Sequence, residues 1–296
     1  MSSLLCVVID LSIEQWHSST DFSVSDLFTH LIPFLNAHVA ASNDNQLAVF
    51  AALPGTSQLL YSSTDDQSQS LASGHNSYPQ FQVLDETVVN RVIIHLDTLP
   101  DQDHQAPCSL VGALTKALCF INRLTLDHNA NTSNAEGLEP IALPDPRILI
   151  LSVSPDITSS YIPIMNSIFS AQKLKVTIDA CQLFGTDSVF LQQAAHLTGG
   201  SYLHLEHREA LLQYLTMTFL PSPSVRKAIA VPTQDKVDFR AACFCHKNII
   251  DIGFVCSVCL STSARVFYLS HQIPDENSPA SECVTSSGAA QGRVLD

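Results

Sequence analysis

The chain has 296 residues, of which 46% are hydrophobic and 14% are charged, and its formal net charge is −14. This hydrophobic content excludes a chain that is disordered throughout, and the length is typical of about two domains. Residues 1–90 contain nine acidic residues and no lysine or arginine, which excludes a basic nucleic-acid-binding face in this part of the chain.

The first half of the chain opens with an unbroken apolar run that ends in Asp10. Such a run is typical of a strand buried on both faces of a parallel sheet. The elements that the pattern predicts next are a helix at 22–41 with a kink at Pro33, a hairpin at 47–53 and 57–61 around Pro54 and Gly55, a polar loop at 62–80, helices at 84–99 and 110–126, and a polar insert at 129–146.

The second half alternates strands and helices more regularly. The pattern predicts strands at 148–153, 176–183 and 202–205, and helices at 161–171, 189–197 and 209–219. This alternation indicates an α/β fold with a doubly wound, mostly parallel sheet. We therefore expect an α/β domain at 1–220, a proline-punctuated linker at 221–236, a cysteine module at 237–260 and a disordered tail at 261–296.

The α/β domain carries none of the usual catalytic signatures: no G-x-G-x-x-G, no phosphate-binding G-x-x-x-x-G-K-[ST] loop and no G-x-S-x-G. Cys6, Cys119 and Cys181 lie within apolar runs and are expected to be inert core thiols. Cys108 has no flanking positive charge to lower its pKa, which argues against a nucleophile. We therefore expect a protein that is not an enzyme.

Two polar clusters of this domain raise the question of a metal site. His204, Glu206 and His207 lie at the end of a strand, where such residues indicate a solvated turn. The loop that begins Asp10-Leu11-Ser12 resembles D-x-S-x-S, with which von Willebrand A (vWA) domains hold Mg²⁺ through Asp and hydroxyl oxygens.

That loop needs partners from elsewhere in the chain. Mg²⁺ requires several oxygen ligands, and vWA domains add a Thr and a second Asp. The corresponding positions here are Cys108 and Val153, whose thiol and isopropyl groups supply no oxygen. We therefore expect a degenerate, empty metal loop, in which Asp10 and Ser12 shape a turn and cap a helix.

The cysteine module has the spacing C-x-C-x(10)-C-x(2)-C, formed by Cys243, Cys245, Cys256 and Cys259. The spacing predicts a structural Zn²⁺ site, with His246 as an alternative ligand, rather than a redox dithiol or a chance cluster. No apolar run approaches the ~18 residues that cross a bilayer, and no signal peptide is evident, so we expect these thiols in a reducing, intracellular compartment. With five basic and three acidic residues over 221–260, the module favours protein contacts over nucleic acid.

Residues 237–246 and 252–261 closely resemble the vWA/zinc-finger subunit of the core complex of the general transcription and DNA repair factor TFIIH. The segments 117–121, 165–173, 191–194 and 198–200 resemble the same family, and the similarity spans about residues 4–261. The family continues after Ser261 with more cysteines, whereas the tail here holds only Cys283. A zinc ion shared with later cysteines would leave the finger incomplete, whereas a tetrahedron of the four named cysteines would not.

The resemblance implies a nuclear, non-enzymatic scaffold that acts in RNA polymerase II transcription initiation and nucleotide excision repair. Its vWA-like domain would hold the RING-bearing sister subunit, and the pair would support the helicases. The subunit would meet nucleic acid only through the complex and would not contact a membrane. The alternatives are an independent cation-dependent vWA ligand-binding module and a DNA-binding zinc-finger protein.

Overall fold

The computed structural model describes residues 3–19, 22–64, 78–99, 106–133, 145–157, 160–226, 228–229, 250, 252–255 and 262–263. The chain divides into two compact units. The first comprises residues 1–156 and 163–237, and the second comprises residues 157–162 and 238–296. Among the described residues, no helix is both long enough and apolar enough to span a bilayer.

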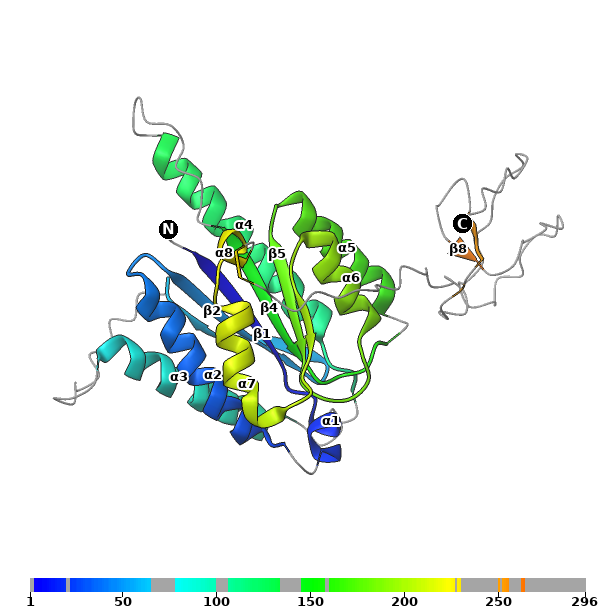
Figure 1. The fold of residues 1–296 in the computed structure, drawn as a ribbon, viewed down its shortest axis with the longest axis horizontal. Helices are drawn as coiled ribbons and strands as arrows, with labels where there is room; N and C mark the ends of the chain where they lie inside the picture. Colours follow the sequence, from blue (N-terminus) through cyan, green and yellow to red (C-terminus); the bar gives the residue numbers. More distant parts are fainter. Residues whose placement is uncertain are drawn as a thin grey trace. The chain divides into compact units, whose positions relative to one another are not determined.

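The first unit is an α/β domain whose elements appear in Figure 1. Its strands are β1 (Leu4–Asp10), β2 (Gln46–Leu53), β3 (Thr56–Ser62), β4 (Pro146–Ser152), β5 (Thr177–Gln182) and β6 (Tyr202–His204). Its helices are α1 (Ile13–Ser18), α2 (Val24–Ala41), α3 (Pro79–Asp97), α4 (Leu110–Ser133), α5 (Tyr161–Lys173, whose first two residues cluster with the second unit), α6 (Val189–Thr198), the 3₁₀ turn η3 (Arg208–Ala210), α7 (Leu211–Tyr214), the π-helical turn η4 (Leu215–Phe219) and α8 (Pro223–Arg226).

The six strands form one sheet in the order β3-β2-β1-β4-β5-β6, in which only β3 runs antiparallel to its neighbour. β1 lies between β2 and β4, and all seven of its residues are buried. This position explains its unbroken apolar run, because a central parallel strand is covered on both faces. The predicted doubly wound, mostly parallel sheet is confirmed.

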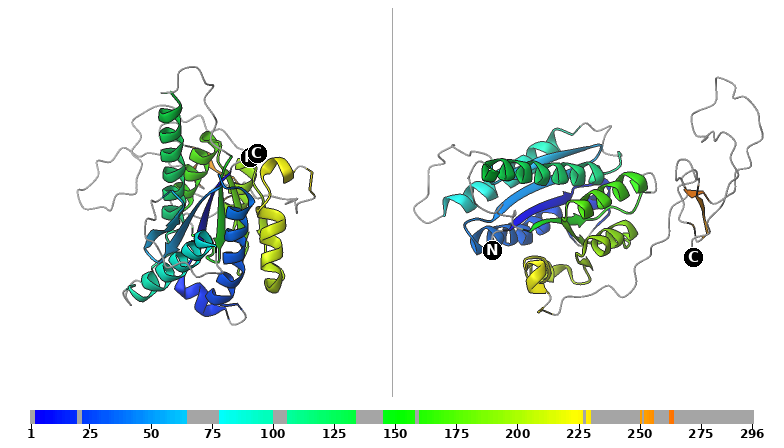
Figure 2. Two further views of the ribbon diagram at one scale, coloured as in Figure 1. Left: turned by 90° about the vertical axis from the view of Figure 1, so that its left-hand side faces the viewer. Right: turned by 90° about the horizontal axis from the view of Figure 1, so that it is seen from above.

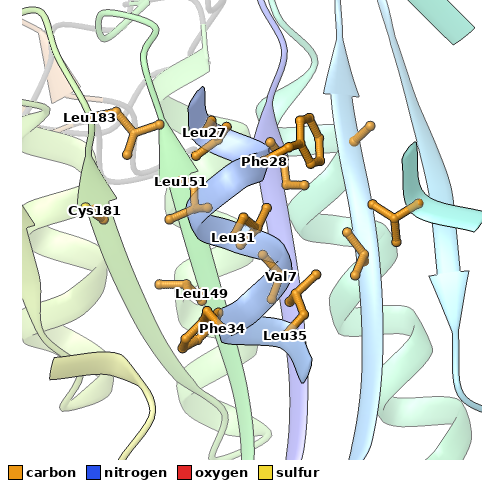
Figure 3. Close-up of a cluster of buried hydrophobic side chains, with 14 of the residues drawn as sticks. Val7, Leu27, Phe28, Leu31, Phe34, Leu35, Leu149, Leu151, Cys181 and Leu183 are labelled. Carbon is orange, nitrogen blue, oxygen red and sulfur yellow. The ribbon is translucent and has the colours of Figure 1, made fainter. Parts of the chain in front are cut away.

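Helices cover both faces of the sheet, as Figure 2 shows for α2 and α4. α2 lays Leu27, Leu31 and Phe34 across alternate residues of β1, β4 and β5 (Figure 3), and α3 and α7 contribute to the same cluster. On the α4 face, the Phe120 ring packs edge-on against that of Phe50 in β2, with 6.0 Å between ring centroids. These two apolar layers make the core of the first unit.

Helix boundaries depart from the sequence prediction where local signals act. α2 continues through Pro33, and a reciprocal capping box of Ser23 and Asp26 starts it. α3 begins at Pro79, inside the predicted loop, because proline is favoured in the first turn of a helix. α4 runs on into the predicted polar insert and extends beyond the sheet in Figure 1, where it needs no apolar face.

Two further predictions were too simple. The single helix expected at 209–219 is instead the succession η3, α7 and η4. In the second unit, β7 (Phe254–Val255) pairs antiparallel with β8 (Thr262–Ser263). The two residues of β8 belong to the segment predicted as a disordered tail, so strand structure reaches into that segment.

Candidate functional site: a buried carboxylate at the carboxyl edge of the sheet

Asp10 is the last residue of β1 and is fully buried. Because β1, β2 and β4 are parallel, their carboxyl ends meet at the same edge of the sheet, where open α/β sheets place their ligand sites. The segments that follow β1 and β4, together with Cys108 before α4, converge on the Asp10 side chain. The residues that the sequence analysis placed around a metal loop are therefore together in the structure.

Both carboxylate oxygens of Asp10 accept hydrogen bonds from the protein. Oδ1 accepts from the Ser12 N–H at 3.1 Å and from the Cys108 thiol at 3.0 Å. Oδ2 accepts from the Ser152 hydroxyl at 3.2 Å, the Val153 N–H at 3.1 Å and the Ser154 N–H at 2.8 Å. One side chain thus joins the loop after β1, the loop after β4 and the start of α4.

The Cys108 thiol is held in its protonated, donating form. Burial and the adjacent negative charge of Asp10 raise its pKa well above the usual range. A protonated thiol and the Val153 isopropyl group do not supply the oxygen shell that Mg²⁺ requires. Among the described residues, no three His, Cys, Asp or Glu side chains are grouped so as to hold a metal ion. The hydrogen-bond donors around Asp10 therefore suit a carboxylate that joins these segments by hydrogen bonds, and they do not suit the coordination of a hard cation such as Mg²⁺.

The segment after Asp10 forms a short helix packed on the same edge. Ser12 precedes α1 as its N-cap residue, but its side chain makes no cap hydrogen bond; its N–H instead bonds the Asp10 carboxylate and makes the turn. The Trp16 indole N–H donates to the Asp10 backbone carbonyl at 2.9 Å, and its ring contacts Phe22 and Phe184. The predicted turn is present, and the predicted side-chain cap is not.

The proposed zinc ligands Cys243, Cys245, Cys256 and Cys259, with His246, all lie outside the described residues. Adjacent to the C-x-x-C pair in sequence, β7 is described and pairs with β8. The zinc site therefore stays a prediction.

The remaining predicted groups divide between the core and the surface. Cys6 and Cys181 are buried, and burial raises the pKa of each thiol. The prediction of a core thiol is wrong for Cys119, which is exposed on α4. His204 Nδ1 lies 2.6 Å from Asp187 Oδ1, so this histidine has a carboxylate partner at the surface.

Sequence reasoning missed a second buried polar cluster at the opposite end of the sheet. Arg226 makes a two-pronged ion pair with Asp179 of β5, with N–O distances of 2.5 and 2.7 Å. Arg147 of β4, which is 1% exposed, donates to the carbonyls of Phe219 and Pro221 at 2.9 and 2.8 Å. An arginine before an apolar run and an aspartate inside one were the signals in the sequence. The cluster fixes the end of η4, where the chain leaves the sheet.

Comparisons with known proteins agree with this architecture. The family "Transcription factor Tfb4" matches residues 2–268. The general transcription and DNA repair factor IIH subunit tfb4 of Schizosaccharomyces pombe is 39% identical over 265 residues, covering 88% of this chain and 83% of that protein. The TFB4 subunit of Arabidopsis thaliana is 34% identical over 270 residues, with the same two coverages.

A solved structure shows the same fold. The crystal structure of the TFIIH p34 N-terminal domain superposes with a TM-score of 0.62 at 31% sequence identity, covering 73% of this chain and 97% of that one. The mixed, mostly parallel sheet with helices on both faces is vWA-like. The family match extends past Ser261, where the sequence resemblance was placed to end. The chain belongs to the Tfb4 family.

Proposed function

We propose that this chain is a non-catalytic structural subunit of the TFIIH core complex, acting in the nucleus in RNA polymerase II transcription initiation and nucleotide excision repair. The observation that carries the proposal is the family match over residues 2–268, together with relatives that are named as transcription and DNA repair factor IIH subunits. A buried carboxylate that is bonded only to structural donors supports a binding role rather than a chemical one.

The proposed division of labour follows the two units. The α/β unit holds the RING-bearing sister subunit, and this pair supports the helicases. The second unit is stiffened by Zn²⁺ bound to Cys243, Cys245, Cys256 and Cys259, or with His246 in place of one of them. Paired thiolates two and three residues apart suit the tetrahedral geometry of Zn²⁺, and the β7–β8 pair is adjacent to the second pair in sequence.

Affinity purification of the tagged full chain from nuclear extract, followed by mass spectrometry, tests the proposal. We expect the TFIIH core subunits with the wild-type chain. A full-length chain carrying Cys256→Ser and Cys259→Ser should lose zinc but keep the sister subunit, since the α/β unit folds on its own core. Recovery of no TFIIH subunit overturns the proposed function, and an unchanged zinc content in the variant overturns the ligand set.

The cation-dependent alternative predicts a different result for Asp10. Calorimetric titration of the full chain with Mg²⁺ should give no binding heat, because the carboxylate already accepts hydrogen bonds at both oxygens. A saturable heat that disappears in Asp10→Ala would instead establish a cation site. Binding to DNA that weakens steeply with salt would likewise favour the DNA-binding alternative.

A further inference from the structure

The sheet of the α/β unit has two edges of unequal length. β6, at one edge, has three residues, which is short enough to offer little to a pairing strand. β3, at the other edge, has seven residues and, among the residues that the structure describes, pairs with β2 alone. Within this described part of the chain, the outer side of β3 is the long free edge of the sheet.

The sequence of β3 carries the features of an aggregation-prone strand. Residues 56–62 read TSQLLYS and contain no charged residue, no proline and no glycine. Uncharged segments of this length with β-forming side chains pair readily with identical segments of another chain. The composition of the strand does not oppose such pairing, so protection has to come from its backbone geometry and from its neighbours.

Two helices supply that protection, one on each side of the strand. From α3, the Arg91 guanidinium donates to the Leu60 carbonyl at 2.8 Å. From α4, the Lys116 ammonium donates to the Ser57 carbonyl. Arg91 and Lys116 are the only lysine or arginine residues in the first 116 positions of this acidic chain, and both side chains bond carbonyls of the same strand, β3.

The Leu60 carbonyl lies at a local irregularity of the strand. Val49 pairs with Tyr61 and Phe50 pairs with Leu59, so Leu60 is the extra residue of a β-bulge. Bulges and lysine side chains are both devices by which natural sheets blunt an exposed edge. β3 therefore combines a bulge in its own backbone with two basic side chains that bond its carbonyls.

We propose that Arg91 and Lys116 close the β3 edge against strand addition, and that the partner they exclude is a second copy of this chain paired through its own β3. Two uncharged edge strands related by a two-fold axis would form an antiparallel, self-complementary contact. The basic side chains oppose it, because each occupies a carbonyl at the edge and because pairing would bring like charges of the two copies together. The proposal goes beyond the proposed function and does not depend on it.

Sedimentation velocity of the purified full chain over a range of concentrations tests the proposal. The variant R91M/K116M keeps the length and helix preference of both side chains but removes the donors and charges. We expect its average mass to rise with concentration toward twice that of one chain, and backbone amides of β3 to exchange more slowly with deuterium in the associated form.

Matched variants separate this effect from a general loss of charge. R91K/K116R retains both cations and should sediment as the wild type. Arg123→Met removes a basic residue of α4 that stacks on Phe120 and should also leave the mass unchanged. If R91M/K116M does not fold, R91M and K116M are measured singly. A folded R91M/K116M, or two folded single variants, sedimenting as the wild type would overturn the proposal, as would equal association of Arg123→Met.

Discussion

Asp10→Asn tests whether the buried carboxylate is a structural joint. The substitution keeps the shape of the side chain but replaces one acceptor oxygen with an NH₂ group. In either orientation of the amide, the NH₂ group faces hydrogen-bond donors: Ser12 N–H and the Cys108 thiol on one side, or Ser152, Val153 and Ser154 on the other. The less damaging orientation still leaves the Ser12 N–H without an acceptor.

The expected cost follows from those contacts. A hydrogen bond to a charged group contributes about 1.5–3 kcal/mol and a neutral one about 1, while an unsatisfied buried donor costs about 1–3 kcal/mol. Three bonds weakened from charged to neutral, by about 0.5–2 kcal/mol each, and one N–H left unpaired give a loss of about 2.5–9 kcal/mol. That is a large share of the ~5–15 kcal/mol by which domains are stable.

Urea unfolding followed by tryptophan fluorescence measures this loss. The chain has a single tryptophan, Trp16, whose indole N–H bonds the Asp10 carbonyl, so the signal comes from the site itself. Asp44→Asn is the matched control, because Asp44 is exposed in the turn before β2 and the same change there should cost less than about 0.5 kcal/mol. A free energy of unfolding for Asp10→Asn within 1 kcal/mol of the wild type, judged on the same ~1 kcal/mol scale of a neutral hydrogen bond, would refute the reasoning.

Three other perturbations give distinct outcomes. Burial lowers the pKa of His38 to about 4, so the unfolded chain takes up the proton first as the pH drops, and the free energy of unfolding should fall by about 3 kcal/mol between pH 6.5 and pH 4. Urea unfolding measured over this pH range should depend less on pH in His38→Gln, and an unchanged dependence would contradict the assignment. Arg226→Met leaves the Asp179 carboxylate buried without its partner and should lower the free energy of unfolding by about 3–5 kcal/mol. The double variant that also carries Asp179→Asn should lose less than the sum of the two single variants, and additive losses would count against a coupled pair. Gly200→Ala places a Cβ 1.9 Å from a backbone carbonyl oxygen of β5, so it should destabilise the protein more than Gly199→Ala. At Gly199 the Cβ has open space, and only the φ of +74° opposes it, at a cost of about 1 kcal/mol. Thermal unfolding compares the two variants, and the reverse order of stability would refute the packing argument.

The strands and the Asp10 site were predictable because their signals are local. A seven-residue apolar run that ends in an acid marks both a buried central strand and the edge at which its last side chain lies. Cys108 and Val153 could be placed beside Asp10 because they occupy the positions at which the vWA domains that the loop resembles carry Thr and a second Asp, and the structure has both in contact with the carboxylate. The absence of an oxygen ligand at these two positions then follows from the thiol of Cys108 and the isopropyl group of Val153.

The rest required tertiary information. The Arg226–Asp179 pair joins residues 47 positions apart, and no spacing rule connects them. Cys119 was misplaced because residues 117–121 are five consecutive apolar residues on a helix, and such a run extends around the whole helix, so some of it must face solvent. The π-helical turn η4 replaces a regular helix end at the point where the Arg147 guanidinium donates hydrogen bonds to the carbonyls of Phe219 and Pro221.

The two buried polar clusters show what the charges in the interior of this domain do. Asp10 joins loops at the carboxyl edge of the sheet, and the Asp179–Arg226 pair fixes the point at the other end where the chain leaves it. Neither offers a reacting group to solvent, yet both hold surface segments in fixed positions, which is what a binding partner needs from a rigid framework. Loss of either cluster should therefore act through the stability and abundance of the subunit, whereas loss of the cations at the β3 edge should in addition change association.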